Sequence, residues 1–153
     1  MVLDKNFKEF IGLLNAHNVK FLVIGGYAVN FHGYPRYTND MDFWIWLEPQ
    51  NVQNLMKALK DFGFGSVGLT ESDFLLPTNI IQLGYEPLRI DILMELEKCN
   101  FEECYQRKTQ ISVDNVTVDF LNIDDLITVK KQAGRLQDLA DADNLEKLKK
   151  KKK

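Results

Sequence analysis

Hydrophobic and polar residues alternate with period two along residues 40–47, the clearest strand pattern in the chain. Side chains alternate across a strand, so one face carries Asp40, Asp42, Trp44 and Trp46. The opposite face is wholly apolar and comprises Met41, Phe43, Ile45 and Leu47. The pattern therefore predicts a strand that packs one face on the core and presents two neighbouring carboxylates on the other.

The remaining patterns predict a mixture of helices and strands. Predicted helices cover residues 6–17, 27–31, 50–62 and 100–107, and a helical region capped by Asp124 runs into the C-terminal lysines with a break at Gly134. Predicted strands cover residues 20–24, 79–83, 88–96, 110–113 and 116–121. Two hairpins, 79–96 and 110–121, exclude a purely parallel sheet, so the expected fold class is α/β (α+β), a mixed β-sheet with packed helices. Residues 65–77 show no clear pattern and are either a mobile lid or a surface loop.

Length and composition predict a single globular domain, residues 1–148, followed by a disordered lysine tail, 149–153. Taking these five lysines away from the net charge of -3 leaves -8 on the rest of the chain. An acidic body disfavours a surface that coats nucleic acid. A tail that touches RNA is the alternative to a merely solvated end.

The expected location is the cytoplasm. No apolar run reaches the length of a membrane span, and the charged N-terminal segment lacks the pattern of a secretory signal. Cys99 and Cys104 are the only cysteines, which is neither a disulfide framework nor a zinc spacing.

The two carboxylates of residues 40–47 point into the same space and would repel one another without a cation. Mg²⁺ takes carboxylate and phosphate oxygens as ligands, with Mn²⁺ as the alternative ion. A second strand pattern places Arg89 and Asp91 together on one face. A third carboxylate at this place would complete a site for two metal ions, where Arg89 could neutralise triphosphate charge.

Two glycines, Gly25 and Gly26, stand where the predicted strand 20–24 meets a helix. Glycines at such a junction let backbone N–H groups approach a phosphate without interference from Cβ atoms. A Gly-Gly turn alone means little, but here it precedes the Asp-x-Asp strand.

The order Gly25-Gly26, thirteen residues, Asp40-Met41-Asp42 and a later Asp91 between apolar residues resembles the DNA polymerase beta-like nucleotidyltransferase superfamily. The stretch from Arg36 to Asp42 is similar to the Arg-x-Thr-x-Asp-x-Asp form of its small bacterial and archaeal members. A C-terminal helix of those members is matched by Lys130, Arg135, Asp138, Asp141 and Leu145. The resemblance extends from about residue 7 to residue 145.

This resemblance implies a compact catalytic palm that binds an NTP, with ATP favoured. Gly25, Gly26 and Thr38 would contact the phosphates, and Asp40 and Asp42 would ligate two Mg²⁺ ions. Asp91 would ligate one ion and help to take the acceptor's proton. An NMP, expected to be AMP, would pass to a hydroxyl with release of pyrophosphate.

Several residues have a plainer alternative. Arg36 and Arg89 either bind triphosphate or only pair with the acids. Trp44 and Trp46 either stack on a nucleobase or lie under a covering helix. Lys130 either reaches a phosphate or is an exposed lysine in an ion pair, and Arg135 with Asp138 is expected to be a helix-surface pair.

The leading hypothesis is a metal-dependent nucleotidyltransferase whose acceptor is a protein, a tRNA end or a small molecule, as in toxin–antitoxin components or antibiotic-modifying enzymes. A partner chain or a homodimer would supply acceptor recognition. The alternative is a non-catalytic nucleotide-binding or protein-interaction subunit, such as an antitoxin or a regulator. A general RNA-binding module that uses the lysine tail is a third hypothesis.

Overall fold

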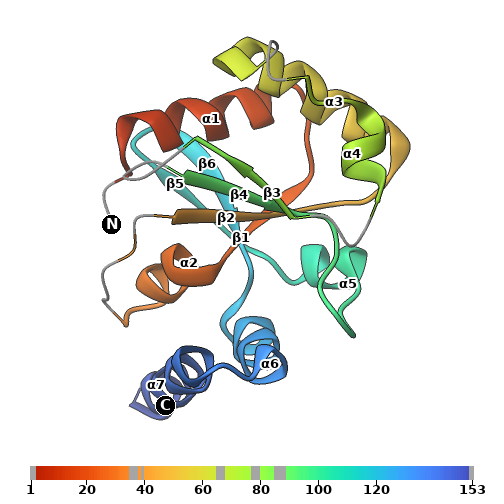
Figure 1. Ribbon diagram of the computed structural model, residues 1–153. Helices are drawn as coiled ribbons and strands as arrows, with labels where there is room; N and C mark the ends of the chain where they lie inside the picture. Colours follow the sequence, from red (N-terminus) through yellow and green to blue (C-terminus); the bar gives the residue numbers. More distant parts are fainter. Residues whose placement is uncertain are drawn as a thin grey trace.

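The computed structural model describes residues 3–34, 38, 40–64, 68–76, 80–84 and 89–151, which form a six-stranded mixed sheet with helices on both faces (Figure 1). The strands are β1 (Phe21–Ile24), β2 (Asp40–Ile45), β3 (Ile80–Leu83), β4 (Arg89–Leu93), β5 (Thr109–Val113) and β6 (Val116–Phe120). The helices are α1 (Lys5–Ala16), α2 (Gly25–Phe31), α3 (Pro49–Leu59), α4 (Glu71–Leu75), α5 (Phe101–Gln106), α6 (Ile123–Ala133) and α7 (Leu136–Lys151). A π-helical turn, Lys60–Phe64, extends α3.

The strand order is β3-β4-β2-β1-β6-β5. The pairs β2–β4 and β1–β6 are parallel, whereas β1–β2 and the two hairpins β3–β4 and β5–β6 are antiparallel. This arrangement confirms the mixed sheet that the two hairpins predict. It also places β2 and β4, the strands that carry the predicted acids, next to each other in the interior of the sheet.

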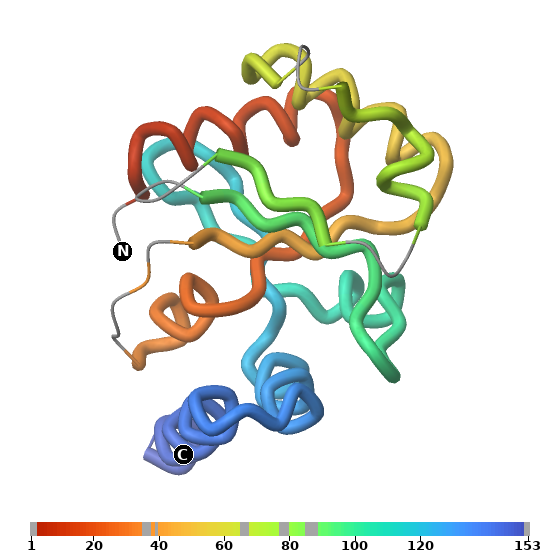
Figure 2. Tube along the Cα trace, in the orientation of Figure 1, coloured from red at the N-terminus to blue at the C-terminus, as the bar shows by residue number. Residues whose placement is uncertain are grey.

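The helices divide into two layers. Helices α1, α3 and α4 cover one face of the sheet, and α2 and α5 lie on the other, with α6 and α7 beyond them (Figures 1 and 2). The apolar row of β2 faces the first layer, where Phe43 meets Phe10 of α1 with ring centroids 5.2 Å apart. The opposite face of β2 meets the second layer, where Trp44 packs on Phe101 of α5. The acidic face of β2 therefore looks toward α2, α5, α6 and α7.

Local sequence signals account for several element boundaries. The Asn100 side chain accepts a hydrogen bond from the backbone N–H of Glu103 and so caps α5, as predicted. Asp114 and Asn115 adopt positive φ values of 51° and 68° in the β5–β6 hairpin, which confirms the predicted turn. Gly134 ends α6 in the left-handed conformation with φ 72°, which confirms the predicted break.

Three features differ from the sequence-based expectation. Residues 71–75 form the short helix α4, which the sequence analysis did not assign. Asn122 rather than Asp124 caps α6, because its side chain accepts a hydrogen bond from the backbone N–H of Asp125. Residues 149–151 continue α7, and Lys149 forms an ion pair with Asp124, whereas residues 152 and 153 of the expected tail lie outside the described residues.

No helix in the described part of the chain is long and apolar enough to cross a membrane.

Candidate active site

Three carboxylates predicted from separate segments lie together on adjacent strands. In the parallel pairing of β2 with β4, Asp42 is in register with Asp91, and Asp40 with Arg89. Neighbouring strands lie about 4.8 Å apart, and side chains in register share a face. Asp91 is 8% exposed, and Asp40 and Asp42 are half-buried. The fold therefore gathers Asp40, Asp42 and Asp91 into one acidic cluster on the second-layer face of the sheet.

Gly25 directly adjoins this acidic cluster. It begins α2 immediately after β1, where Ile24 is in register with Asp42. Its φ of 69° is a left-handed conformation that L side chains rarely adopt. A Cβ atom there would lie 2.0 Å from the Asp42 Oδ2 atom, far inside van der Waals contact. Glycine is thus required at this position both by the backbone and by the close approach of the carboxylate.

The electrostatics of the acidic cluster are dominated by crowded negative charge. The pKa of Asp42 is raised to about 7, chiefly by burial and then by the charge of Asp91, a hydrogen bond to Asp91 and the charge of Asp40. The charge of Lys130 acts in the opposite sense and lowers this pKa. A carboxyl group that ionises only near neutral pH at such a place is a marker of a functional site.

Arg89 bridges two members of the acidic cluster. Its Nη2 donates a hydrogen bond of 2.5 Å to Asp40 Oδ2, and its Nε donates one of 3.0 Å to Asp91 Oδ1. The sequence left two roles open for Arg89, triphosphate binding and pairing with the acids. The structure contains the pairing with the acids. Contact of Arg89 with triphosphate stays a prediction.

The other residues expected to contact nucleotide occupy different positions around the cluster. Gly26 is buried in the first turn of α2. Thr38 is half-buried just before β2, and its Oγ1 forms long hydrogen bonds of 3.4 Å with the backbone of Asp40. Arg36 lies outside the described residues.

Lys130 belongs to a buried ionic network between α6 and α7. Its Nζ lies 3.3 Å from Asp138 Oδ1 and 3.1 Å from Asp141 Oδ2. Lys130, Asp138 and Asp141 are 6%, 2% and 0% exposed. Of the two alternatives for Lys130, the exposed lysine is therefore wrong, because two carboxylates from the facing helix hold the ammonium in the interior.

Arg135 joins the same network from the short connection between α6 and α7. Its Nε donates a hydrogen bond of 2.7 Å to Asp138 Oδ2, while most of the arginine side chain is exposed. The sequence-based interpretation of Arg135 and Asp138 as a surface pair is correct for the arginine only. The sequence did carry a signal of this ionic network, namely the family-like spacing of Lys130, Arg135, Asp138 and Asp141. That spacing does not indicate which of the side chains are buried.

The two tryptophans have different environments. Trp44 is 1% exposed and packs edge-on against Phe101 of α5, so a covering helix buries it and it offers no face to a base. Trp46 is half-buried, and Lys20 Nζ lies 4.8 Å from the centroid of its ring. Stacking of Trp46 on a nucleobase stays a prediction.

The donor set of the acidic cluster fits a hard divalent cation. Asp40, Asp42 and Asp91 supply carboxylate oxygens only, the ligands that Mg²⁺ prefers. Their crowded charge, visible in the raised pKa of Asp42, is what a cation would neutralise. Within the described ranges no group of three His, Cys, Asp or Glu side chains is already arranged to hold a metal, and the Arg89 guanidinium bridges Asp40 and Asp91. Metal binding at this cluster therefore requires that the guanidinium move aside.

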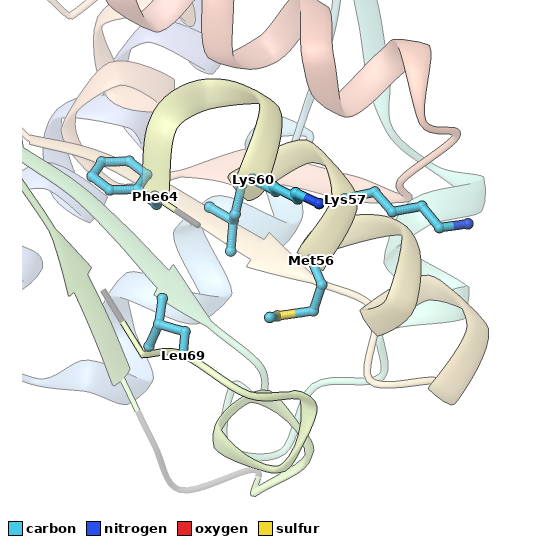
Figure 3. Close-up of a pocket in the computed structure, with 6 residues that line it drawn as sticks. Met56, Lys57, Lys60, Phe64 and Leu69 are labelled. Carbon is cyan, nitrogen blue, oxygen red and sulfur yellow. The ribbon is translucent and has the colours of Figure 1, made fainter. Parts of the chain in front are cut away.

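A separate apolar hollow of about 230 Å³ lies beside α3 and the π-helical turn (Figure 3). Its lining comprises Met56, Lys57, Leu59, Lys60, Phe64 and Leu69. No carboxylate is among the described residues that line it, and α3 covers the face of the sheet opposite the acidic cluster. This hollow and the acidic cluster therefore lie on opposite faces of the sheet.

A family model described as nucleotidyl transferase of unknown function (DUF2204) matches residues 4–153. The chain belongs to this family. Membership makes the protein a nucleotidyl transferase whose substrate is a nucleotide, and it confirms the class of protein that the glycine and aspartate pattern resembles. No curated protein matches the sequence.

Two solved structures share the fold of this nucleotidyl transferase. The lincosamide antibiotic adenylyltransferase LnuA, solved with lincomycin bound, is similar with a TM-score of 0.61 at 16% identity, over 96% of this chain and 98% of LnuA. An antigenic nucleotidyltransferase-like protein from Paracoccidioides brasiliensis gives a TM-score of 0.53 at 13% identity, over 97% of this chain and 78% of that protein. At such low identity the likeness establishes the fold, so substrates must be argued from the site itself.

Proposed function

We propose that this nucleotidyl transferase moves an NMP from an NTP to a hydroxyl group of a small molecule, with divalent metal bound by Asp40, Asp42 and Asp91. The observation that carries the proposal is the register of Asp42 with Asp91, directly against the glycine that begins α2. Three carboxylates at a strand-to-helix glycine turn suit triphosphate chemistry better than any other feature of the described chain.

In the proposed reaction, the acceptor oxygen attacks the α-phosphorus of the NTP. The bond from this phosphorus to the bridging oxygen breaks, and pyrophosphate leaves with the electron pair. Mg²⁺, when bound, would neutralise phosphate charge and align the reacting oxygens. Asp91 would accept the hydroxyl proton, and Asp40 and Asp42 would hold the cations. The backbone N–H groups at Gly25 and Gly26 supply donors to the phosphates, because no Cβ separates Gly25 from the ligand side of the turn.

We favour the adenylyl group as the group transferred and a small molecule as the acceptor. The named activity of LnuA, an adenylyltransferase solved with an antibiotic, supports both choices by analogy of fold. The acidic body of the chain argues against a long nucleic-acid acceptor, since polyanions would be repelled. A protein or a tRNA end, as in a toxin–antitoxin system, remains the alternative acceptor that the first experiment distinguishes.

The experiment incubates the protein with each of four α-labelled NTPs and Mg²⁺ or Mn²⁺, and follows label into the protein, tRNA and small-molecule fractions of a lysate. An Asp40→Asn/Asp42→Asn double variant is the matched control, because it keeps side-chain shape but removes two charges. We expect label from ATP in the small-molecule fraction with the wild type only. Label in the tRNA or protein fraction would overturn the acceptor assignment.

A non-catalytic subunit is the competing function. The presence of all three carboxylates on adjacent strands, with Asp42 in register with Asp91, argues against it, because the loss of one would suffice to disable metal binding. Nucleotide binding without transfer to any fraction, by protein shown to be folded, would favour this alternative.

A further inference from the structure

Another hollow, of about 270 Å³, lies beside α5, the helix that covers part of the same sheet face as the acidic cluster (Figure 1). The buried residues that line it include Trp44 of β2, Met94 and Phe101 of α5. Trp46 lines it as well and is half-buried. Aromatic rings therefore make up much of its lining, and we call it the aromatic hollow.

The aromatic hollow begins one step along β2 from the acidic cluster. In the pairing of β2 with β4, Asp42 is in register with Asp91, and two residues further on Trp44 is in register with Leu93. Residues two apart on a strand share a face and lie about 7 Å from each other. A small molecule about 10 Å long can therefore fill the hollow with one end and reach the carboxylates with the other.

The lining of the aromatic hollow favours a cation attached to an apolar body. Two carboxylates, Glu95 and Glu102, line it together with the rings of Trp46 and Phe101. Both glutamates are exposed, so their charges stand where the hollow meets solvent. The faces of aromatic rings attract cations, and the ring of Trp does so most strongly. Rings and carboxylates together thus select a ligand with a positive charge and disfavour an anion.

A cation of the protein itself already lies on one of these rings. Lys20 Nζ is 4.8 Å from the ring centroid of Trp46 and 5.7 Å from that of Tyr105. This lysine lines a neighbouring hollow of about 150 Å³, which shares Trp46, Phe101 and Glu102 with the aromatic hollow. No cationic side chain is among the described residues that line the aromatic hollow itself. The same kind of surroundings that accommodate the Lys20 ammonium are therefore open there to an ammonium from outside.

We propose that the aromatic hollow binds a protonated amine carried on an apolar or aromatic body, and that it holds the amine-bearing end of the acceptor while a hydroxyl group of the same molecule lies at the acidic cluster. The acceptor role rests on the proposed function and deepens it by naming a chemical class of acceptor. Binding of the amine itself needs neither metal nor nucleotide.

Amine binding can be followed at the hollow directly, because Trp44 and Trp46 are the only tryptophans of the chain and both line it. Their two indole N–H signals in an NMR spectrum of ¹⁵N-labelled protein are the readout. The probes are phenethylamine, which is cationic at pH 7, neutral 2-phenylethanol and anionic 3-phenylpropionate. Phenethylamine should shift the signals saturably with a millimolar Kd, as expected of so small a ligand, and the other two should bind at least about fivefold more weakly. Equal affinity for all three probes, or no saturable shift with phenethylamine, would overturn the amine site.

The role of the two carboxylates is tested by a Glu95→Gln/Glu102→Gln double variant. It should weaken phenethylamine binding about fivefold, the effect of removing exposed charges next to a cation. The matched control is Glu97→Gln/Glu103→Gln, which removes two exposed carboxylates of the same segments that do not line the hollow. An equal loss in this control would overturn the assignment, since the effect would then be one of general charge.

The acceptor role has a separate readout in the transfer reaction. Lysate passed over a cation-exchange resin at pH 7 should lose its acceptor, and phenethylamine should raise the KM for the acceptor fraction without changing the KM for ATP. An acceptor that flows through the resin, or a KM for the acceptor that phenethylamine leaves unchanged, would overturn this role. Saturable amine binding by folded protein that transfers no label to any fraction would instead contradict the proposed function and leave the amine site in place.

Discussion

Gly25 and Asp42 approach each other so closely that a single methyl group on the glycine would lie 2.0 Å from a carboxylate oxygen. The relationship joins the strand-to-helix turn of β1 and α2 to the acidic cluster of β2 and β4. A side chain at residue 25 would have to displace Asp42, because the clash is with its carboxylate and Cγ atoms together. The turn and the acid are therefore one structural unit.

Replacement of this glycine is expected to damage the site more than the fold. Gly25→Ala should lower stability by about 1–2 kcal/mol through its positive φ and should reduce transfer activity at least a hundredfold by displacing Asp42. Gly63→Ala is the matched control, since Gly63 also has a positive φ, 107°, but nothing lies within 4 Å of its would-be Cβ. Thermal melts and initial rates on both variants make the comparison. Full activity in folded Gly25→Ala protein would show that the contact is unimportant.

The raised pKa of Asp42 predicts a pH-dependent stability of the metal-free protein. Because the pKa is about 7 in the folded state and about 4 in the unfolded state, the folded protein binds more protons between these values. This group's contribution therefore makes the fold less stable as the pH rises from about 4 to about 7. At pH 8 in EDTA, Asp42→Asn should raise the free energy of unfolding above that of the wild type by on the order of 1–2 kcal/mol, and with it the Tm. The difference should shrink toward pH 5. A Tm difference that is independent of pH would contradict the assignment of this pKa.

Arg89 is expected to act as the cation of the acidic cluster when no metal is bound. Arg89→Met should destabilise the protein in EDTA by about 1–3 kcal/mol, because it leaves Asp40 and Asp91 without their shared donor. Addition of Mn²⁺ should recover much of the lost Tm, since an ion can occupy the place of the guanidinium. The control is Arg107→Met, which removes an arginine paired with Asp125 on the exposed surface. Mn²⁺ should raise the Tm of Arg89→Met more than that of Arg107→Met. An equal rise in the Tm of both variants would argue against a cation site at the acidic cluster.

The sequence predicts the strands and the acidic face well because both depend on local periodicity. Period-two alternation placed Asp40 and Asp42 on one face, and the structure sets Asp42 in register with Asp91 on the neighbouring strand. The missed helix α4 had a detectable signal, since Thr70 and Asp73 form a capping box at its start. Five residues are nevertheless too few to produce a helical period.

The parts of the site that the sequence could not predict depend on contacts between distant elements. The bridge from Arg89 to Asp40 exists because β4 pairs with β2 in one particular register. The burial of Lys130 depends on how α7 folds back on α6 after Gly134, which places Asp138 and Asp141 around the ammonium. Spacing alone suggested a surface ion pair because spacing carries no information on which helix face is covered.

The central claim, metal-dependent transfer of a nucleotidyl group by the acidic cluster, is tested most directly by comparing α-labelled with γ-labelled ATP. The comparison uses wild-type protein, Asp42→Asn protein and the acceptor fraction identified from the lysate, with Mg²⁺ or EDTA. The account predicts that the acceptor gains the α-label only, that the γ-label leaves as pyrophosphate, and that both signals vanish with Asp42→Asn or with EDTA. Transfer of the γ-label to the acceptor, or undiminished α-label transfer by folded Asp42→Asn protein, would contradict it.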